Sequence, residues 1–154
     1  MRHTRKPRIG IIGMGHFIYW PQFDGLKEEL MQKQKDFAKY FSKDSDIIDI
    51  GFADDVDTAF GCLKKAKAED IDALFIVMAT YITSQVAFPF AKYLDVPQVL
   101  VGIQPLDRLD YGKCTTHMQL VNDDICSMPE FAGVYERLGA KMPFFLVEAS
   151  GNEE

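Results

Sequence analysis

The amino-acid sequence predicts an α/β protein whose parallel sheet is covered by helices on both faces. Short runs rich in isoleucine, valine and leucine alternate along the chain with longer segments of amphipathic helical periodicity. The apolar residues of these runs occupy consecutive positions, which is typical of strands buried on both faces. Five such units joined by right-handed crossovers favour a three-layer α/β/α sandwich, flavodoxin-like, with a five-stranded parallel sheet.

Each element of this fold can be assigned to a segment of the chain. The strands are expected at residues 8–13, 46–52, 71–78, 98–103 and 144–149. The helices are expected at residues 21–42, 54–68, 83–94 and 119–139, the last broken before Pro129 and ended by Gly139. Pro21 suits the first turn of a helix, and the acidic residues 54–57 suit a helix N-terminus, where negative charge is favourable. Residues 105–117 lack periodicity and are long for a connection, so they are either a functional loop or an insertion.

Composition restricts the class of protein. A length of 154 residues with 47% hydrophobic composition predicts one domain, residues 1–154. The net charge of −6 argues against nucleic acid or an anionic membrane as the main partner and favours a small uncharged ligand. The three cysteines, Cys62, Cys114 and Cys126, lie too far apart to suggest a disulfide framework or a zinc site. The apolar run behind the basic N-terminus is too short to span a membrane, so we expect a cytoplasmic protein.

The segment RIGIIGMGHFIYW, residues 8–20, looks like the first strand and glycine turn of a dinucleotide-binding fold. Gly13 and Gly15 have the required spacing, but Ile18 stands where the third glycine is needed, and aromatic residues crowd the place of a pyrophosphate. We therefore interpret the two glycines as a tight turn that needs positive φ, and not as a cofactor loop.

Aromatic and polar side chains follow the predicted strands at the carboxyl edge of the sheet, where ligands bind in such folds. Aromatic rings stack on the CH faces of sugars, while histidines and amides bond hydroxyl groups. The candidate substrate-binding residues are His16, Phe17, Tyr19, Tyr81, His117 and Asn122. Taken singly, a histidine or tyrosine after a buried strand is better explained as a partly buried residue with a satisfied hydrogen bond, and it is the convergence of several at one edge that favours a sugar pocket.

No spacing in the sequence predicts a metal site or a catalytic residue. Tight ligand pairs such as H-x-x-x-H are absent from the sequence, and the adjacent Asp123 and Asp124 would point about 100° apart on a helix. Cys114 and His117 have i, i+3 spacing, but they lie in a predicted loop, so an incidental thiol explains Cys114 better than a nucleophile.

Three segments resemble the N-terminal part of the L-arabinose isomerase and L-fucose isomerase superfamily, most of all its arabinose-isomerase-like branch. They are RIGIIGMGHFIYWPQFDGL, ALFIVMATYITSQVAFPFAKYLDVPQVLVG and THMQLVNDDICSMPEFAGVYERLGA, and the likeness extends from about Lys6 to Glu148. The resemblance implies the N-terminal flavodoxin-like domain of a longer, Mn²⁺-dependent aldose-ketose isomerase that forms oligomers.

At the level of single residues the resemblance is partial. His16 matches the histidine of the family's first-strand turn, but Gly15 stands where the family has glutamine. Asn122 agrees with a later family segment, in which Asp123 and Cys126 replace a glutamine and a histidine. The sugar preference of the arabinose enzymes therefore does not carry over.

The glutamates and histidines that hold manganese in that family lie in later domains. The resemblance thus implies a domain that contributes sugar-pocket and subunit-interface residues but contains no metal and is inactive alone. Its partners would be a sugar, the remaining isomerase domains and neighbouring subunits of a homo-oligomer. The alternative is a free-standing flavodoxin-like sugar-binding or assembly protein without catalysis.

Overall fold

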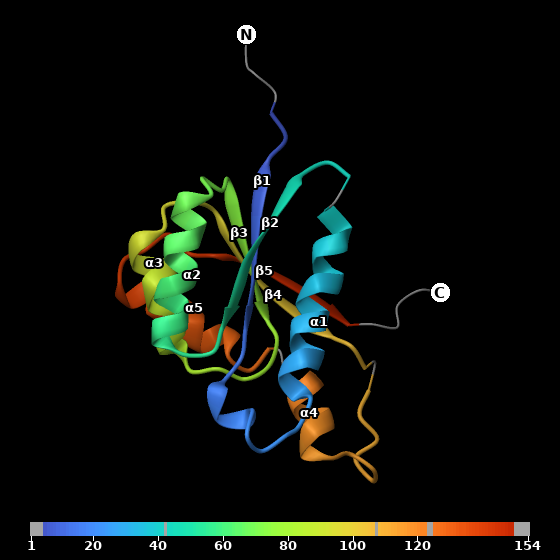
Figure 1. Ribbon diagram of the computed structural model, residues 1–154. Coiled ribbons are helices and arrows are strands. Elements are labelled where there is room, and N and C mark those ends of the chain that lie inside the picture. Colours follow the sequence, from blue (N-terminus) through green and yellow to red (C-terminus); the bar gives the residue numbers. More distant parts are fainter. Residues whose placement is uncertain (1–4, 42, 107, 123–124, 150–154) are drawn as a thin grey trace.

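The chain forms a three-layer α/β/α sandwich in the computed structural model, which describes residues 5–41, 43–106, 108–122 and 125–149 (Figure 1). The described strands are β1 (Arg8–Met14), β2 (Asp46–Ala53), β3 (Ala73–Met78), β4 (Gln98–Gln104) and β5 (Phe144–Ala149). They form a five-stranded sheet in the order β2-β1-β3-β4-β5, and every neighbouring pair is parallel. This is the flavodoxin-like order, so the predicted fold class is confirmed.

The helices cover the two faces of the sheet unequally. α2 (Val56–Ala68), α3 (Phe88–Tyr93) and α5 (Met128–Arg137) lie on one face, whereas α1 (Leu26–Ala38) lies on the other, with the short α4 (Thr116–Asn122) beside its N-terminal end (Figure 1). Short 3₁₀ turns η1 (Phe17–Tyr19), η2 (Lys39–Phe41) and η3 (Ser84–Ala87) join them. Within the described ranges, no helix has the length and apolar character needed to cross a membrane.

Consecutive strand residues serve opposite faces of the sheet. Ile12 and Met14 of β1 pack into the core on the side of α2, α3 and α5, whereas Ile9 and Ile11 pack with Phe37 of α1. Because both faces of the central strands are covered, the sequence places apolar residues at consecutive positions, as the analysis of periodicity predicted.

The first helix begins at Leu26 and not at Pro21, so the predicted start was wrong. Residues 17–25 form η1 and successive turns, in which the Tyr19 N–H donates to the His16 carbonyl (3.1 Å). Gly25, immediately before α1, has φ 79°, a left-handed conformation that separates these turns from the helix.

The other predicted boundaries hold with small shifts. α2 begins after Asp55, whose side chain caps the helix by accepting from the Thr58 N–H (2.7 Å). The helix predicted at residues 83–94 is divided into η3 and α3. The break before Pro129 is confirmed, since α5 begins one residue earlier, and Gly139 ends that segment with φ 60°.

Gly13 and Gly15 do not adopt positive φ, so the reason given for them from the sequence was wrong. They are needed because other side chains approach them closely. A Cβ at Gly13 would lie 2.5 Å from Gln34 Oε1 and 2.6 Å from a Phe52 ring carbon, and one at Gly15 would lie 2.8 Å from the Trp20 ring. The protein's own side chains thus fill the space that these glycines leave.

We expect Gly13→Ala to lower the free energy of unfolding by about 1–3 kcal/mol, because the added methyl group overpacks the contact with Gln34 and Phe52. Gly61→Ala is the matched control, because Gly61 lies within α2 and a Cβ there meets open space. That change should raise the free energy of unfolding by up to about 1 kcal/mol through helix propensity. Urea denaturation measures both values, and an unchanged Gly13→Ala midpoint would contradict the packing account.

Candidate functional site

The candidate site lies at the carboxyl ends of β1 and β3. These strands are neighbours, but the chain leaves β1 towards β2 and leaves β3 in the opposite direction, towards β4. In open α/β sheets, ligands bind in the crevice outside such a point. His16 follows β1 and Tyr81 follows β3, so both residues belong to this edge.

Four of the six predicted residues lie close together here, with the rings of the other three grouped around His16. The ring centroid of His16 lies 5.2 Å from that of Phe17, 5.7 Å from that of Tyr19 and 6.3 Å from that of Tyr81. η1 supplies Phe17 and Tyr19, and Phe17 is 52% exposed. We call His16, Phe17, Tyr19 and Tyr81 the histidine cluster.

Two polar atoms at this edge are buried without a hydrogen-bond partner among the described residues. They are Nδ1 of His16 and Oγ1 of Thr80, the residue before Tyr81. Buried donors and acceptors are nearly always bonded, so each unpartnered atom needs an explanation. A water molecule or a hydroxyl group is the kind of partner that suits such atoms, because it both donates and accepts.

The N-terminal end of α5 is hydrogen-bonded to the segment that follows β3 at the same edge. Ser127 is fully buried, and its Oγ accepts a hydrogen bond from the Ile82 N–H at 2.9 Å. Burial raises the pKa of Tyr81 above its usual value, and the nearby carboxylate of Glu130 acts in the same direction. The Tyr81 phenol is therefore neutral at physiological pH and can donate a hydrogen bond.

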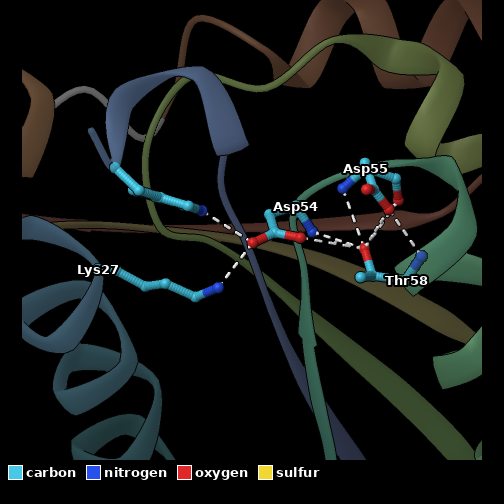
Figure 2. Close-up of polar contacts among 5 residues, drawn as sticks. Lys27, Asp54, Asp55 and Thr58 are labelled. Carbon is cyan, nitrogen blue, oxygen red and sulfur yellow. Dashed lines mark hydrogen bonds and ion pairs between the residues drawn. The ribbon is translucent and has the colours of Figure 1, made fainter. Parts of the chain in front are cut away.

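A buried carboxylate anchors the turn that carries the cluster (Figure 2). Asp54 Oδ2 accepts from Trp20 Nε1 at 2.8 Å and from Lys27 Nζ at 2.7 Å, while Oδ1 accepts from Thr58 Oγ1 at 3.2 Å. The Asp54 carbonyl also accepts from the Phe17 N–H at 3.2 Å. These bonds join the turn after β1 to α1 and to the start of α2.

The charge of Asp54 is stabilised by these donors. Burial alone would raise its pKa, but the hydrogen bonds from Lys27 and Trp20 outweigh burial and hold the pKa below its usual value. The acidic residues 54–57 were predicted to place charge at a helix N-terminus, which is the role of the cap Asp55, whereas Asp54 instead accepts from Trp20 and Lys27. No local spacing connects Trp20, Lys27 and Asp54, because they come from three separate segments.

His117 and Asn122 contact other partners, at α4. His117 Nε2 lies 2.9 Å from Glu29 Oε2, and its ring centroid lies 6.2 Å from that of Phe23. Asn122 is buried, and its Oδ1 accepts from the Leu106 N–H at 3.0 Å, which fixes the loop after β4. For these two residues the structure thus provides intrachain bonds, and it brings neither into the histidine cluster.

A groove of about 810 Å³ lies on the α1 side of the sheet, near these α4 contacts. Its lining includes Glu29, Lys33, Phe37, Tyr40, Ile103, Pro105 and Val121. Lys33 Nζ crosses from α1 to donate to the Val121 carbonyl at 2.8 Å. The groove therefore belongs to α1, η2, α4 and the carboxyl end of β4, and the histidine cluster is a separate feature.

Metal-binding and thiol chemistry find no support in the part of the chain that the structure describes. That part contains no group of three or more His, Cys, Asp or Glu side chains placed to hold a metal, and Asp123 and Asp124 lie outside it. Burial raises the pKa of the Cys62 thiol to about 11, so it stays protonated. The Cys114 thiol donates to the neighbouring Thr115 carbonyl at 3.5 Å.

Comparison with protein-family models and with curated proteins gives no match. Among solved structures, the chain is similar to a protein from Rhizobium etli described as a transcriptional regulator of the LacI family. The similarity covers 94% of this chain and 57% of that one, with 12% sequence identity and a TM-score of 0.41. A likeness at this level does not extend to function.

We expect Asp54→Asn to lower the free energy of unfolding by about 1–3 kcal/mol at neutral pH, because bonds from Lys27 and Trp20 to a charged acceptor are weakened. The folded-state pKa of Asp54 is depressed, so its charge stabilises the protein above the unfolded-state pKa of about 3.9. That contribution is lost as the pH falls through the folded-state pKa.

The wild type and Asp54→Asn should therefore differ most at neutral pH and converge only at pH values below the depressed folded-state pKa of Asp54. Denaturation at several pH values measures this, with Asp44→Asn at an exposed position as the control. A difference that stays constant with pH would show that the charge of Asp54 has no part in stability.

Proposed function

We propose that this domain binds a sugar at the carboxyl ends of β1 and β3, and that it serves as the N-terminal domain of an arabinose/fucose-type aldose-ketose isomerase. The observation that supports the proposal most is the histidine cluster, with an unpartnered nitrogen on His16 and an unpartnered hydroxyl on Thr80 beside it.

The chemistry of the cluster suits an aldose. Phe17 and Tyr19 offer apolar ring faces for the CH groups of a sugar, and Tyr81 offers a neutral hydroxyl. Nδ1 of His16 is buried, so a half-turn of the imidazole about its Cβ–Cγ bond is needed to bring that nitrogen to a ligand. The acidic chain, with a net charge of −6, favours an uncharged ligand over an anionic one.

The roles of this domain and of the remaining domains follow from the resemblance to the isomerase superfamily. In this proposal the domain supplies walls of a sugar pocket and surfaces for the remaining isomerase domains and neighbouring subunits of a homo-oligomer. Mn²⁺ would be held by the other domains of the complete cytoplasmic enzyme, where it would polarise sugar oxygens. No step of the isomerisation is assigned to residues of this chain.

We expect the purified chain to bind L-arabinose or L-fucose weakly, with NMR shift changes centred on residues 15–20 and 79–82. His16→Ala should weaken this binding at least about tenfold, because it removes a hydrogen-bonding group and a ring contact. Tyr111→Ala, at a tyrosine that is 89% exposed, is the control and should bind as the wild type does.

Unchanged binding in His16→Ala, or shift changes confined to the α1 groove, would contradict the proposed site. Isomerase turnover by the purified chain would contradict the assignment of catalysis to other domains. Tight binding of a sugar by the chain alone, without metal, would favour a free-standing sugar-binding protein.

A further inference from the structure

The two outer strands of the sheet differ in how their free edges are protected. β2 carries exposed Asp46 and Asp49, and its register with β1 shifts between Ile11 and Ile12. Gly51, in this irregular part of β2, has φ 118°. Charged side chains and bulges are the common means by which proteins prevent an edge strand from pairing with another chain.

β5 shows no such protection from Phe144 to Val147. It pairs with β4 in continuous register, from Val99 opposite Phe144 to Gln104 opposite Ala149. Its four consecutive apolar side chains, Phe144, Phe145, Leu146 and Val147, are 61%, 51%, 39% and 52% exposed. An edge strand has one row of backbone N–H and C=O groups without a strand partner, so within the described ranges β5 combines an edge that no other strand pairs with and apolar side chains on both faces.

We propose that β5 pairs with β5 of a second copy of this chain, antiparallel about a two-fold axis at Phe145. An axis perpendicular to the sheet makes the two strands antiparallel and keeps equivalent faces on the same side, so the two sheets become continuous. This surface is distinct from the histidine cluster, and the proposal does not rest on sugar binding.

The sequence of β5 is self-complementary in this register. Phe144 and Leu146 share the face of Val99 and Val101, which is the α1 side, and in the pair Phe144 of each copy lies opposite Leu146 of the other. Phe145, on the face of Leu100, lies opposite its own equivalent across the axis.

Neighbouring registers fit less well. In the proposed register Pro143, which has no N–H, lies opposite Val147 at the end of the ladder, whereas centring the pair on Phe144 brings Pro143 opposite Phe145, next to the axis. Centring it on Leu146 leaves Phe144, the most exposed of the four apolar residues, without an apolar residue opposite it. The strand of a second copy can therefore supply β5 with backbone hydrogen bonds, and it places apolar side chains opposite Phe144, Phe145 and Leu146 on the same faces of the sheet.

Sedimentation velocity on the full chain over a concentration series tests the proposal. We expect a reversible dimer with twice the 17.5 kDa mass of the chain. Phe145→Lys and Phe145→Glu should each raise the dimer dissociation constant at least about tenfold, because two like charges then face each other across the axis. Since Phe145 is half exposed, both variants should keep the circular dichroism spectrum of the wild type.

An equimolar mixture of the two variants should restore the dimer, because lysine then faces glutamate. Tyr40→Lys is the control, because Tyr40 lies in η2 at the end of α1 and is 75% exposed, and it should dimerise as the wild type does. A wild type that stays monomeric up to about 1 mM would overturn the proposal and leave the β5 edge to another occupant, such as a later segment of a longer polypeptide. Dimers that persist in both variants, or a mixture that stays monomeric, would overturn it as well.

Discussion

The buried carboxylate of Asp54 holds together the parts of the structure on which the candidate site depends. Placing a charge where it is largely removed from water is costly unless donors surround it, and Trp20, Lys27 and Thr58 supply them. Trp20 belongs to the turn after β1, Lys27 to α1 and Thr58 to α2, so one group joins the turn and the helix that follow β1 to the helix that follows β2. The turn that carries His16 is therefore positioned by α1 and α2 as well as by its own local hydrogen bonds.

The close approach at the two glycines follows from the same arrangement. Trp20 reaches Asp54 by folding back over Gly15, and Phe52 packs over Gly13, so neither glycine can carry a side chain without displacing a neighbour. Gly13 and Gly15 have the spacing of a phosphate-binding turn, but in this structure they allow Phe52 and Trp20 to pack closely against the backbone. The result is a rigid base beneath the aromatic turn, from which η1 presents Phe17 towards solvent.

The sheet order and most element boundaries could be predicted because they depend on local apolar periodicity and on the right-handed crossover. The start of α1 could not, because Trp20 and the Phe17 backbone N–H are bonded to Asp54, which is distant in sequence. The expectation that side chains after the strands gather at the carboxyl edge of the sheet correctly predicted that His16 and Tyr81 lie near each other. The same expectation cannot tell a ligand contact from an intrachain bond, and Glu29 and Leu106 provide such bonds for His117 and Asn122.

A crystal structure of the chain with bound L-arabinose or L-fucose would show whether a sugar satisfies the polar groups of the histidine cluster, as we propose. The account predicts a sugar oxygen within about 2.7–3.2 Å of a His16 ring nitrogen, with a second near the Tyr81 hydroxyl. A sugar bound only in the α1 groove, with the His16 and Thr80 atoms bonded to ordered water, would contradict it.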